Sequence, residues 1–525
     1  MSKRLILILA LAFMVGITCA VYAEVQNVKV SGDITVKGVA RSNFDLTKSP
    51  TADSGHAGVR YDDKERDILS ITRVRVDADL TDNVSATVRL LNERNWNGES
   101  QNGGYPNTNI GNNWRGSADA TGQVAGVNDH TEGDISLDLA YVTLKEFLYS
   151  PLSLTIGRQE LRFGNGLVVG DPDTNLWSAR TALAEGDLSA RKSFDALRAT
   201  LDYNPLVLDL IYAKIEEGDV NLNDDVNLGG VNANYALNKN TTLEGFFFSK
   251  TKGTSAAAVR NVDAGNATVY DLSAAGARNL KDRTDVVNTV GGRVVDKTLK
   301  NLSVDLQAAY QFGTYNPKFD PNARYFIDTL KRETAPRRAW AAQAMATYDL
   351  KDVKAISKYS PSIAATYTYL SGADRNQTGE KAYRGWDPMF EDQTIGHIMN
   401  AILADTNMHK ASFSAKAKLT DDISANLDYV IAAFAKRYPE NIQAVLSGIA
   451  TNGATARIFR MGKGRLIGQE IDAALTYDYT EDVQFSLLSG ILISTKNIKG
   501  DIDTINNDNI GANATELIGS MKVTF

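Results

Sequence analysis

From residue 28 onward, the chain is a succession of segments of roughly ten residues in which apolar and polar side chains alternate. In residues 410–419, for example, Ala411, Phe413 and Leu419 fall on one face, and Lys416 and Lys418 fall on the other. Alternation with a period of two puts one set of side chains on each face of a β-strand. In transmembrane barrels these two faces meet lipid and lumen. The pattern therefore predicts an all-β chain, folded as one antiparallel transmembrane barrel.

The connections between these segments alternate in length. Short turns rich in Asp, Asn, Pro and Lys follow one strand, and long polar segments follow the next, at residues 97–133, 164–193, 250–285, 371–408 and 438–464. Bacterial barrels have short periplasmic turns and long extracellular loops. A soluble sandwich or propeller would also contain alternating strands, but it does not account for the alternating connections.

Walking the chain in this way gives about eighteen strands, an even number, as bacterial barrels require. The segment at 287–297 has the weakest alternation; without it the count is odd. The predicted strands are 28–43, 68–80, 84–95, 135–147, 152–163, 194–203, 206–214, 226–237, 242–250, 287–297, 302–313, 339–350, 362–370, 410–419, 423–436, 466–479, 483–494 and 513–525.

The first residues form a separate segment. Lys3 and Arg4 precede an apolar run at 5–17, and a cleavage site with a small residue follows at Ala23. This is the arrangement of a secretory signal peptide, so residues 1–23 are expected to be removed and residues 24–525 to form the barrel. An uncleaved helical anchor would need about 20 apolar residues, more than this run contains. A lipoprotein signal ending at Cys19 is disfavoured because Thr18 precedes the cysteine, where Gly, Ala or Ser is usual.

Composition excludes several classes of function. The formal charge is −7, whereas a nucleic-acid-binding protein needs a basic surface, so no nucleic-acid partner is expected. Cys19 is the only cysteine and lies in the signal segment, so no disulfide is expected. Metal and phosphate-binding motifs are absent, and neither a metal nor a cofactor is predicted.

The last strand ends in Met521-Lys522-Val523-Thr524-Phe525. Met521, Val523 and Phe525 share the face predicted to meet the lipid bilayer of the outer membrane, and Lys522 and Thr524 share the lumen face. A terminal aromatic residue on such a face resembles the signal through which the barrel assembly machinery recognises outer-membrane proteins. The predicted location is therefore the outer membrane of a Gram-negative-type bacterium.

The polar faces of the strands carry many charges, which cannot face hydrocarbon and predict a wide aqueous lumen. Rings of Arg and Lys select anions. The alternative is that each arginine is braced by a neighbouring acid such as Asp77, Asp79 or Glu93. Near Gly157 the apolar residues change from even to odd positions, which predicts a bulge that turns Arg158, Glu160 and Arg162 inward. The candidate pore-lining residues are Arg73, Arg75, Arg89, Arg158, Arg162, Arg198, Lys416 and Lys418.

Several stretches resemble the alginate-export porin family. They are IGRQELRFGNG at 156–166, ARKSFDALRATLDY at 190–203, ITRVRVDADLTDNVSATVRLL at 71–91, YLSGADRNQTGEKAYRGWDPMF at 369–390 and LIGQEIDAALTYDYTEDVQF at 466–485. The resemblance implies an eighteen-stranded outer-membrane barrel with an arginine-lined lumen that passes the anionic polysaccharide alginate. Matched by motif, Arg73, Arg75, Arg158 and Arg198 would be lumen arginines. Ala373 departs from the family pattern, which usually has Asp there.

The leading functional prediction is a passive channel for anionic solutes, with an anionic polysaccharide such as alginate as one cargo. The alternative is a general, non-specific porin. A third reading is an outer-membrane barrel enzyme. It is disfavoured because His56, His130, His397 and His409 all lie in predicted loops or at strand ends, away from a nucleophile and a carboxylate.

Overall fold

The computed structural model describes residues 27–44, 46, 64–96, 135–174, 186–216, 225–253, 284–316, 334–373, 382–438, 443–445, 458–499 and 513–525. The predicted signal segment at 1–23 lies outside the described residues, as do the predicted loop at 97–133 and parts of the other long connections. Cleavage after Ala23 therefore stays a prediction.

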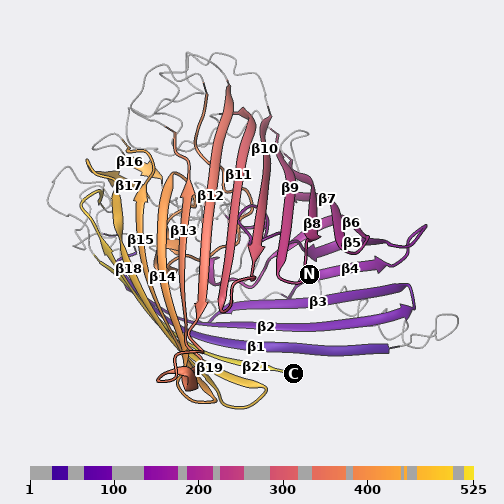
Figure 1. Ribbon diagram of the computed structural model, residues 1–525, viewed down its shortest axis with the longest axis horizontal. Coiled ribbons are helices and arrows are strands. Elements are labelled where there is room, and N and C mark those ends of the chain that lie inside the picture. The colour runs from indigo at the N-terminus through magenta and orange to yellow at the C-terminus, as the bar shows by residue number, and fades with distance from the viewer. Residues whose placement is uncertain are drawn as a thin grey trace, which may run out of the picture.

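Eighteen strands form one sheet that closes on itself (Figure 1). Each strand pairs antiparallel with its neighbour along the wall, and the last strand returns to pair with the first, from Asp33 opposite Thr524 to Ser42 opposite Thr515. The strands are β1 (Asn27–Ser42), β2 (Lys64–Thr81), β3 (Val84–Asn95), β4 (Ile135–Leu144), β5 (Leu152–Glu160), β6 (Ser193–Asp202), β7 (Leu206–Glu216), β8 (Val226–Ala236), β9 (Thr241–Lys252), β10 (Asp285–Asp296), β11 (Leu302–Tyr315), β12 (Ala335–Asp349), β13 (Ser362–Leu370), β14 (Met408–Lys418), β15 (Ile423–Phe434), β18 (Leu466–Asp478), β19 (Val483–Ser494) and β21 (Ala514–Thr524).

The predicted fold class is confirmed, and each predicted strand corresponds to one observed strand, including the weakly alternating segment that becomes β10. The largest differences in bounds are at β2 and β12, which begin at Lys64 and Ala335, four residues earlier than expected. These extensions lie beyond the apolar band, where both faces can meet water. The apolar alternation that identifies a strand in sequence is therefore weak there.

Short hairpin connections all lie at one end of the barrel, which in bacterial barrels is the periplasmic end. Two of them share a local device. The Thr420 hydroxyl accepts a hydrogen bond from Ile423 N at 3.0 Å, and the Thr480 hydroxyl accepts one from Val483 N at 3.0 Å. Side-chain oxygens that bond nearby backbone amides stabilise tight turns, so these sequences reverse the chain after β14 and β18.

The outer face of the wall is apolar. Phe413 on β14 is 57% exposed, whereas Lys410 on the opposite face of the same strand is 1% exposed. Aromatic side chains gather on the outer face near the periplasmic end, among them Tyr203, Tyr348 and Phe525. Apolar bands edged by aromatic residues are the lipid-contacting surface of transmembrane barrels.

A few smaller elements complete the described chain. The strands β16 (Gln443–Val445), β17 (Ile458–Met461) and β20 (Ile498–Lys499) make a separate three-stranded sheet. The helical turns are η1 (Gly186–Leu188), η3 (Ser357–Tyr359) and α4 (His397–Ile402). Across the described residues, no helix has the length and apolar character that a membrane crossing requires.

Candidate functional site

Two connections fold into the barrel and pair with each other. One follows β5, at residues 161–174, and the other joins β13 to β14 and contains α4. Phe390 N donates to Val168 O at 3.0 Å, Gly170 N donates to Phe390 O at 2.7 Å, and Asp392 N donates to Gly166 O at 2.7 Å. A Cβ on Gly170 would lie 2.4 Å from the Cβ of Asp392, so this approach requires glycine. We call these paired segments the inner constriction.

The inner constriction has an apolar core of its own. Phe163 packs on Phe248 of β9 with ring centroids 5.3 Å apart, and Phe390 packs edge-on against Phe194 of β6 at 6.0 Å. Trp386 is 2% exposed. Inward-facing side chains of β6 to β10 here bury apolar surface against the loops instead of meeting water. Part of the lumen is therefore filled by these segments.

Charged contacts attach the inner constriction to the wall at Asp387. Its carboxylate lies 2.5 Å from Lys250 Nζ on β9 and 3.9 Å from the guanidinium of Arg337 on β12. Gln311 of β11 also holds the backbone of this residue through two hydrogen bonds, at 2.7 and 2.8 Å. Burial alone would raise the pKa of Asp387. The charges of Lys250 and Arg337 outweigh burial and lower this pKa to about 2. The carboxylate stays ionised, and its contribution to stability is lost only as pH falls through about 2.

A second attachment is at Asp392. Arg162 donates to its carboxylate at 2.8 Å, and Lys192 pairs with the same group. Two cations from the connection between β5 and β6 therefore hold one anion of the connection between β13 and β14. These pairs join the two inward segments to each other, in addition to their backbone hydrogen bonds.

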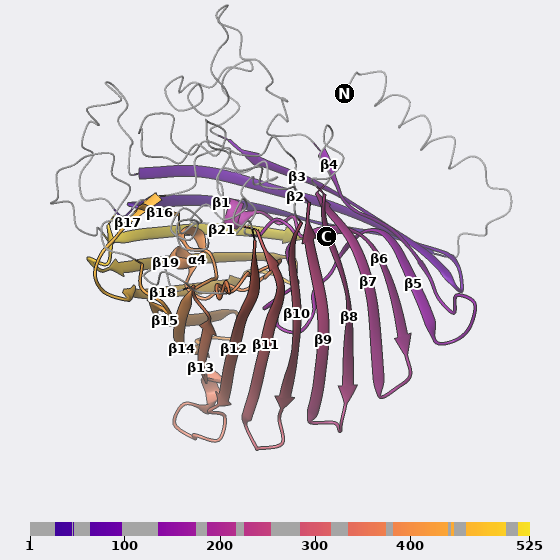
Figure 2. The same ribbon diagram turned by 90° about the horizontal axis from the view of Figure 1, so that it is seen from above.

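The helix α4 is attached to a different part of the wall, near β18 and β19 (Figure 2). Ile398 N and Met399 N donate to the carboxylate of Glu470 on β18 at 2.7 and 2.8 Å. His397 N lies 3.3 Å from an oxygen of Asp472, two residues further along that strand. The connection between β13 and β14 thus reaches from β9 to β18 and crosses the lumen.

The segment before β6 lies on the opposite wall. Asp187 accepts hydrogen bonds from the Arg41 guanidinium of β1 at 2.6 and 3.1 Å, and Arg41 also bonds Glu516 of β21 at 2.7 Å. The carboxylate of Glu93 on β3 accepts from the Ser189 hydroxyl and from Ala190 N, at 2.6 Å for the latter. These contacts attach the connection between β5 and β6 to β1 and β3, close to the pair β1–β21 that closes the barrel.

Four of the arginines predicted to line the pore are each ion-paired. Arg73 bonds Asp33 at 2.9 Å, Arg75 bonds Asp77 at 2.7 Å and Arg198 bonds Asp209 at 2.8 Å. Arg89 lies 2.5 Å from Asp138 and also pairs with Glu160. The bracing that the sequence left open for each arginine is thus present, and it neutralises much of their charge.

Arg158 is placed differently from the prediction. The strand β5 keeps an unbroken register with β6 across Gly157, with Arg158 opposite Asp195 and Gln159 opposite Phe194. Gln159 and Phe194 are both buried, so Arg158 and Asp195, which bond at 2.7 Å, lie on the other face. This corrects the expected inward turn of Arg158.

The even-to-odd change that suggested the turn has another cause. Leu161 and Phe163 are apolar because they pack in the core of the inner constriction, not because they meet lipid. The irregularity of register occurs instead in the neighbouring pair, where β3 and β4 shift between Arg89 and Leu90. At Gly157 itself φ is +123°, and a Cβ would lie 2.1 Å from Ala140 O, so glycine is required there.

Lys416 and Lys418 differ from the arginines. Both lie on the face of β14 opposite Phe413, near its periplasmic end, and both are exposed. Within the part of the chain that the structure describes, neither makes an ion pair or a side-chain hydrogen bond. On this face of β14 they are therefore the two predicted pore-lining cations without an ion-pair partner among the described residues.

The residues that attach the inner constriction to the wall at Asp387 were not singled out from the sequence. Asp387, Lys250 and Arg337 are separated by long stretches of chain, and no local pattern joins them. One signal was available: the segment WDPMF at 386–390, part of a stretch that resembles the family, places an acid between a tryptophan and a Pro-Met-Phe run.

The described histidines do not form a catalytic arrangement. His409 Nδ1 shares a 2.7 Å hydrogen bond with the Tyr367 hydroxyl, and His397 begins α4. His56 and His130 lie outside the described residues. Among the described residues, no three His, Cys, Asp or Glu side chains are grouped to hold a metal ion.

Comparison with known proteins gives a family. Residues 50–492 match the family described as "Alginate export". No curated protein matches the sequence. Solved structures with a similar chain course include Pseudomonas aeruginosa OccK8 (OprE), at 10% identity and a TM-score of 0.48 over 95% of this chain and 98% of that one, and OccK5 (OpdH) from the same organism, at 11% and 0.48 over 96% and 99%.

The family match spans most of the chain, and the wall has the apolar outer face of a transmembrane barrel. The protein is therefore an outer-membrane channel of a Gram-negative-type bacterium, embedded in the lipid bilayer. The chain belongs to the alginate export family.

Proposed function

We propose that the protein is a passive channel for anionic solutes, with acidic saccharides, alginate among them, as its cargo. The observation that carries this proposal is the difference in ion pairing among the predicted pore-lining cations. The arginines at 73, 75, 89 and 198 are balanced by acids, whereas Lys416 and Lys418 are exposed and unbalanced within the described residues. Fixed charges without counter-charges set ion preference in a pore.

This assignment gives the predicted pore-lining residues two roles. The paired arginines, together with Arg162 at the inner constriction, fix the shape of the path. Lys416 and Lys418 attract anions near its periplasmic end. An uncatalysed passage needs no acid–base group, so the proposal assigns the protein no enzymatic activity.

The test is ion selectivity in planar bilayers. We expect Lys416→Gln/Lys418→Gln to lower the anion preference measured from reversal potentials in a salt gradient, because two uncompensated lumen charges are lost. The matched control is Lys145→Gln/Lys239→Gln, which removes two exposed lysines from periplasmic turns. An unselective parent channel, or equal effects of both double variants, would overturn the anion-channel proposal.

The cargo class is tested by current blocking. Oligomers of mannuronate and guluronate should interrupt the ionic current more often than neutral glucose oligomers of equal length, and the Lys416→Gln/Lys418→Gln variant should lose that difference. Equal blocking by charged and neutral oligomers would favour the second candidate, a general porin. That candidate has support in the ion pairing of the arginines, which leaves the lumen with little excess positive charge.

We also propose that the chain is exported with cleavage after Ala23 and that Phe525 is read by the barrel assembly machinery. The intact mass of the purified protein should then correspond to a chain that begins at Glu24. A mass that includes residues 1–23 would contradict the cleavage.

A further inference from the structure

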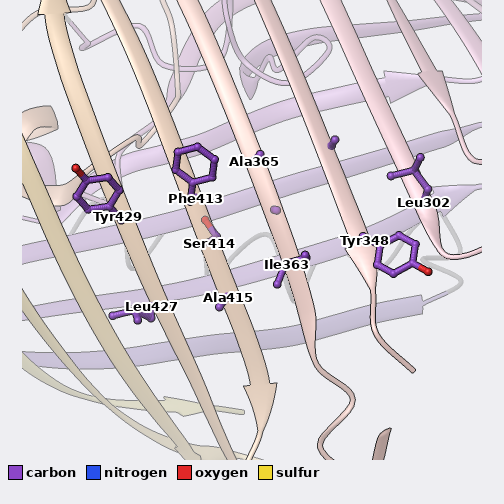
Figure 3. Close-up of a pocket in the computed structure, with 11 residues that line it drawn as sticks. Leu302, Tyr348, Ile363, Ala365, Phe413, Ser414, Ala415, Leu427 and Tyr429 are labelled. Atoms are coloured by element: carbon purple, nitrogen blue, oxygen red, sulfur yellow. The ribbon is translucent and has the colours of Figure 1, made fainter. Parts of the chain in front are cut away.

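A hollow lies on the lipid-facing side of the wall, across β11 to β15, with a volume of about 550 Å³ (Figure 3). Its floor is made by small residues. They are Ala346 of β12, which pairs with Ala365 of β13, and Ala415 of β14. Larger side chains, among them Tyr348, Phe413 and Tyr429, form its sides. The hollow exists because alanines stand where neighbouring strands carry bulky apolar residues.

The part of the hollow over Ile363 and Ala365 lies towards the periplasmic leaflet. Ile363 and Ala365 are the second and fourth residues of β13, which begins at the periplasmic end. At about 3.3 Å per residue, Ala365 lies within roughly 10 Å of that end, which is less than half of an apolar band about 25 Å tall. The acyl chains that reach this depth belong to glycerophospholipids.

The size of the hollow suits an acyl chain. An apolar cavity of about 150 Å³ holds a benzene ring, and on that scale this hollow has room for roughly twenty carbon atoms. Its lining is almost entirely apolar, so a solute with hydrogen-bonding groups along its length would leave them unpaired there. A hydrocarbon chain has no such groups.

A basic segment stands directly beside the hollow. The periplasmic connection between β12 and β13, residues 350–361, is closed by a hydrogen bond from Leu350 N to Pro361 O at 2.8 Å. Asp352 holds it against the adjacent hairpin through Lys300 at 2.7 Å and Asn301 at 2.6 Å. Lys300 and Asn301 immediately precede Leu302, which lines the hollow. The connection is thereby fixed at the mouth of the hollow.

The charges and apolar residues of this connection suit a membrane surface. It carries Lys351, Lys354 and Lys358 against the single acid Asp352, and Val353 and Ile356 are exposed although they lie outside the barrel wall. Lys351 and Lys354 make no ion pair within the described residues. By contrast, the turns at 419–422 and 479–482 are acidic. Each lysine near an anionic lipid surface strengthens binding by about fivefold.

We propose that this hollow and the basic connection beside it form a binding site for one anionic glycerophospholipid of the periplasmic leaflet. One acyl chain lies in the hollow over Ala365 and Ala415, and the phosphate of the headgroup lies between Lys351 and Lys354. Val353 and Ile356 enter the interface beside it. The site is on the outside of the barrel and is independent of the cargo that passes through the lumen.

The test is native mass spectrometry of the full-length protein titrated with phosphatidylglycerol or with zwitterionic phosphatidylethanolamine of the same chain length. We expect tighter retention of phosphatidylglycerol. The Lys351→Gln/Lys354→Gln variant should reduce phosphatidylglycerol binding by about thirtyfold, given the contribution of each lysine, and should leave phosphatidylethanolamine binding nearly unchanged. The matched control is Lys145→Gln/Lys239→Gln, which removes the same charge from other periplasmic turns.

The hollow is tested separately with Ala365→Leu, which fills it and should weaken both lipids. Its control is Ala473→Leu, an exposed alanine on β18 outside the hollow. Equal retention of the two lipids by the parent protein, or equal losses in a variant and its control, would overturn the proposal. So would a stable dimer or trimer in which Ala365→Leu breaks the assembly, since a second copy would then occupy the hollow. Ion selectivity should be the same in all these variants, so failure here is distinguishable from failure of the channel proposal.

Discussion

Deletion of Phe525 is expected to remove most of the heat-modifiable barrel from the outer membrane. Its backbone closes the seam: Gly32 N donates to Phe525 O at 2.8 Å, and Phe525 N donates to Gly32 O at 3.0 Å. Its ring covers Gly32 so closely that a Cβ there would lie 2.6 Å from it. Deletion therefore removes two hydrogen bonds and leaves the backbone N–H and C=O of Gly32 unpaired in the barrel wall. It also removes the aromatic residue proposed as the assembly signal.

The measurement is the fraction of chain that changes mobility on heating, in membrane fractions of cells that express each variant. Phe525→Ala separates the two contributions, because it keeps the backbone closure and removes only the ring. Tyr479→Ala is the control, since Tyr479 is an exposed aromatic residue in a periplasmic turn away from the seam. Normal amounts of heat-modifiable barrel in the deletion variant would contradict both the closure argument and the recognition of Phe525.

The second large effect is expected from Asp387→Asn. This carboxylate is the shared counter-charge of Lys250 and Arg337, and removal of one member of a buried ion pair commonly costs about 3–5 kcal/mol. Asn can keep the hydrogen bond to Met389 N, which lies at 2.8 Å, but it cannot balance the two cations. The connection between β13 and β14 should then leave the wall, which predicts a larger and noisier single-channel conductance.

Asp421→Asn is the matched control, because it removes one acid from an exposed periplasmic turn. Lys250→Met should reproduce part of the effect of Asp387→Asn, and the double variant should show less than the sum of the two, since both changes break one ion pair. A conductance equal to that of the parent protein, with equal protease resistance of the loop, would mean that Asp387 does not hold the inner constriction in place.

The strands were predictable because successive side chains of a β-strand point to opposite faces of the sheet, so that an alternating sequence assigns each residue to one face of the wall. On β14, Phe413 and Lys416 are assigned to opposite faces by their spacing alone. The two faces cannot be interchanged, because a shift of one residue would place the charged side chains in lipid. The same argument placed β10 despite its weak alternation, since a closed wall with both ends of the chain on one side needs an even number of strands.

The bounds of β2 and β12 were less predictable. Lys64 and Ala335 begin strands above the apolar band, where hydrogen bonding to a neighbour continues but the difference between lipid and water has ended. The prediction that Arg158 turns inward was wrong for a related reason. The apolar Leu161 and Phe163 beyond it meet a loop inside the barrel, and sequence periodicity does not distinguish that apolar environment from lipid.

The sequence alone therefore determined the closed barrel, the faces of its strands and the end at which the short turns lie, because these follow from side-chain alternation between neighbouring residues. Only the tertiary structure decided which of the predicted pore-lining cations are ion-paired and which part of the lumen is filled. Arg41 meets Glu516, and Asp387 meets Lys250 and Arg337, across separations in sequence that no local pattern records. Charge neutralisation depends on distance in space, so the lysines of β14 could be distinguished from the arginines of β2 only after the wall had closed.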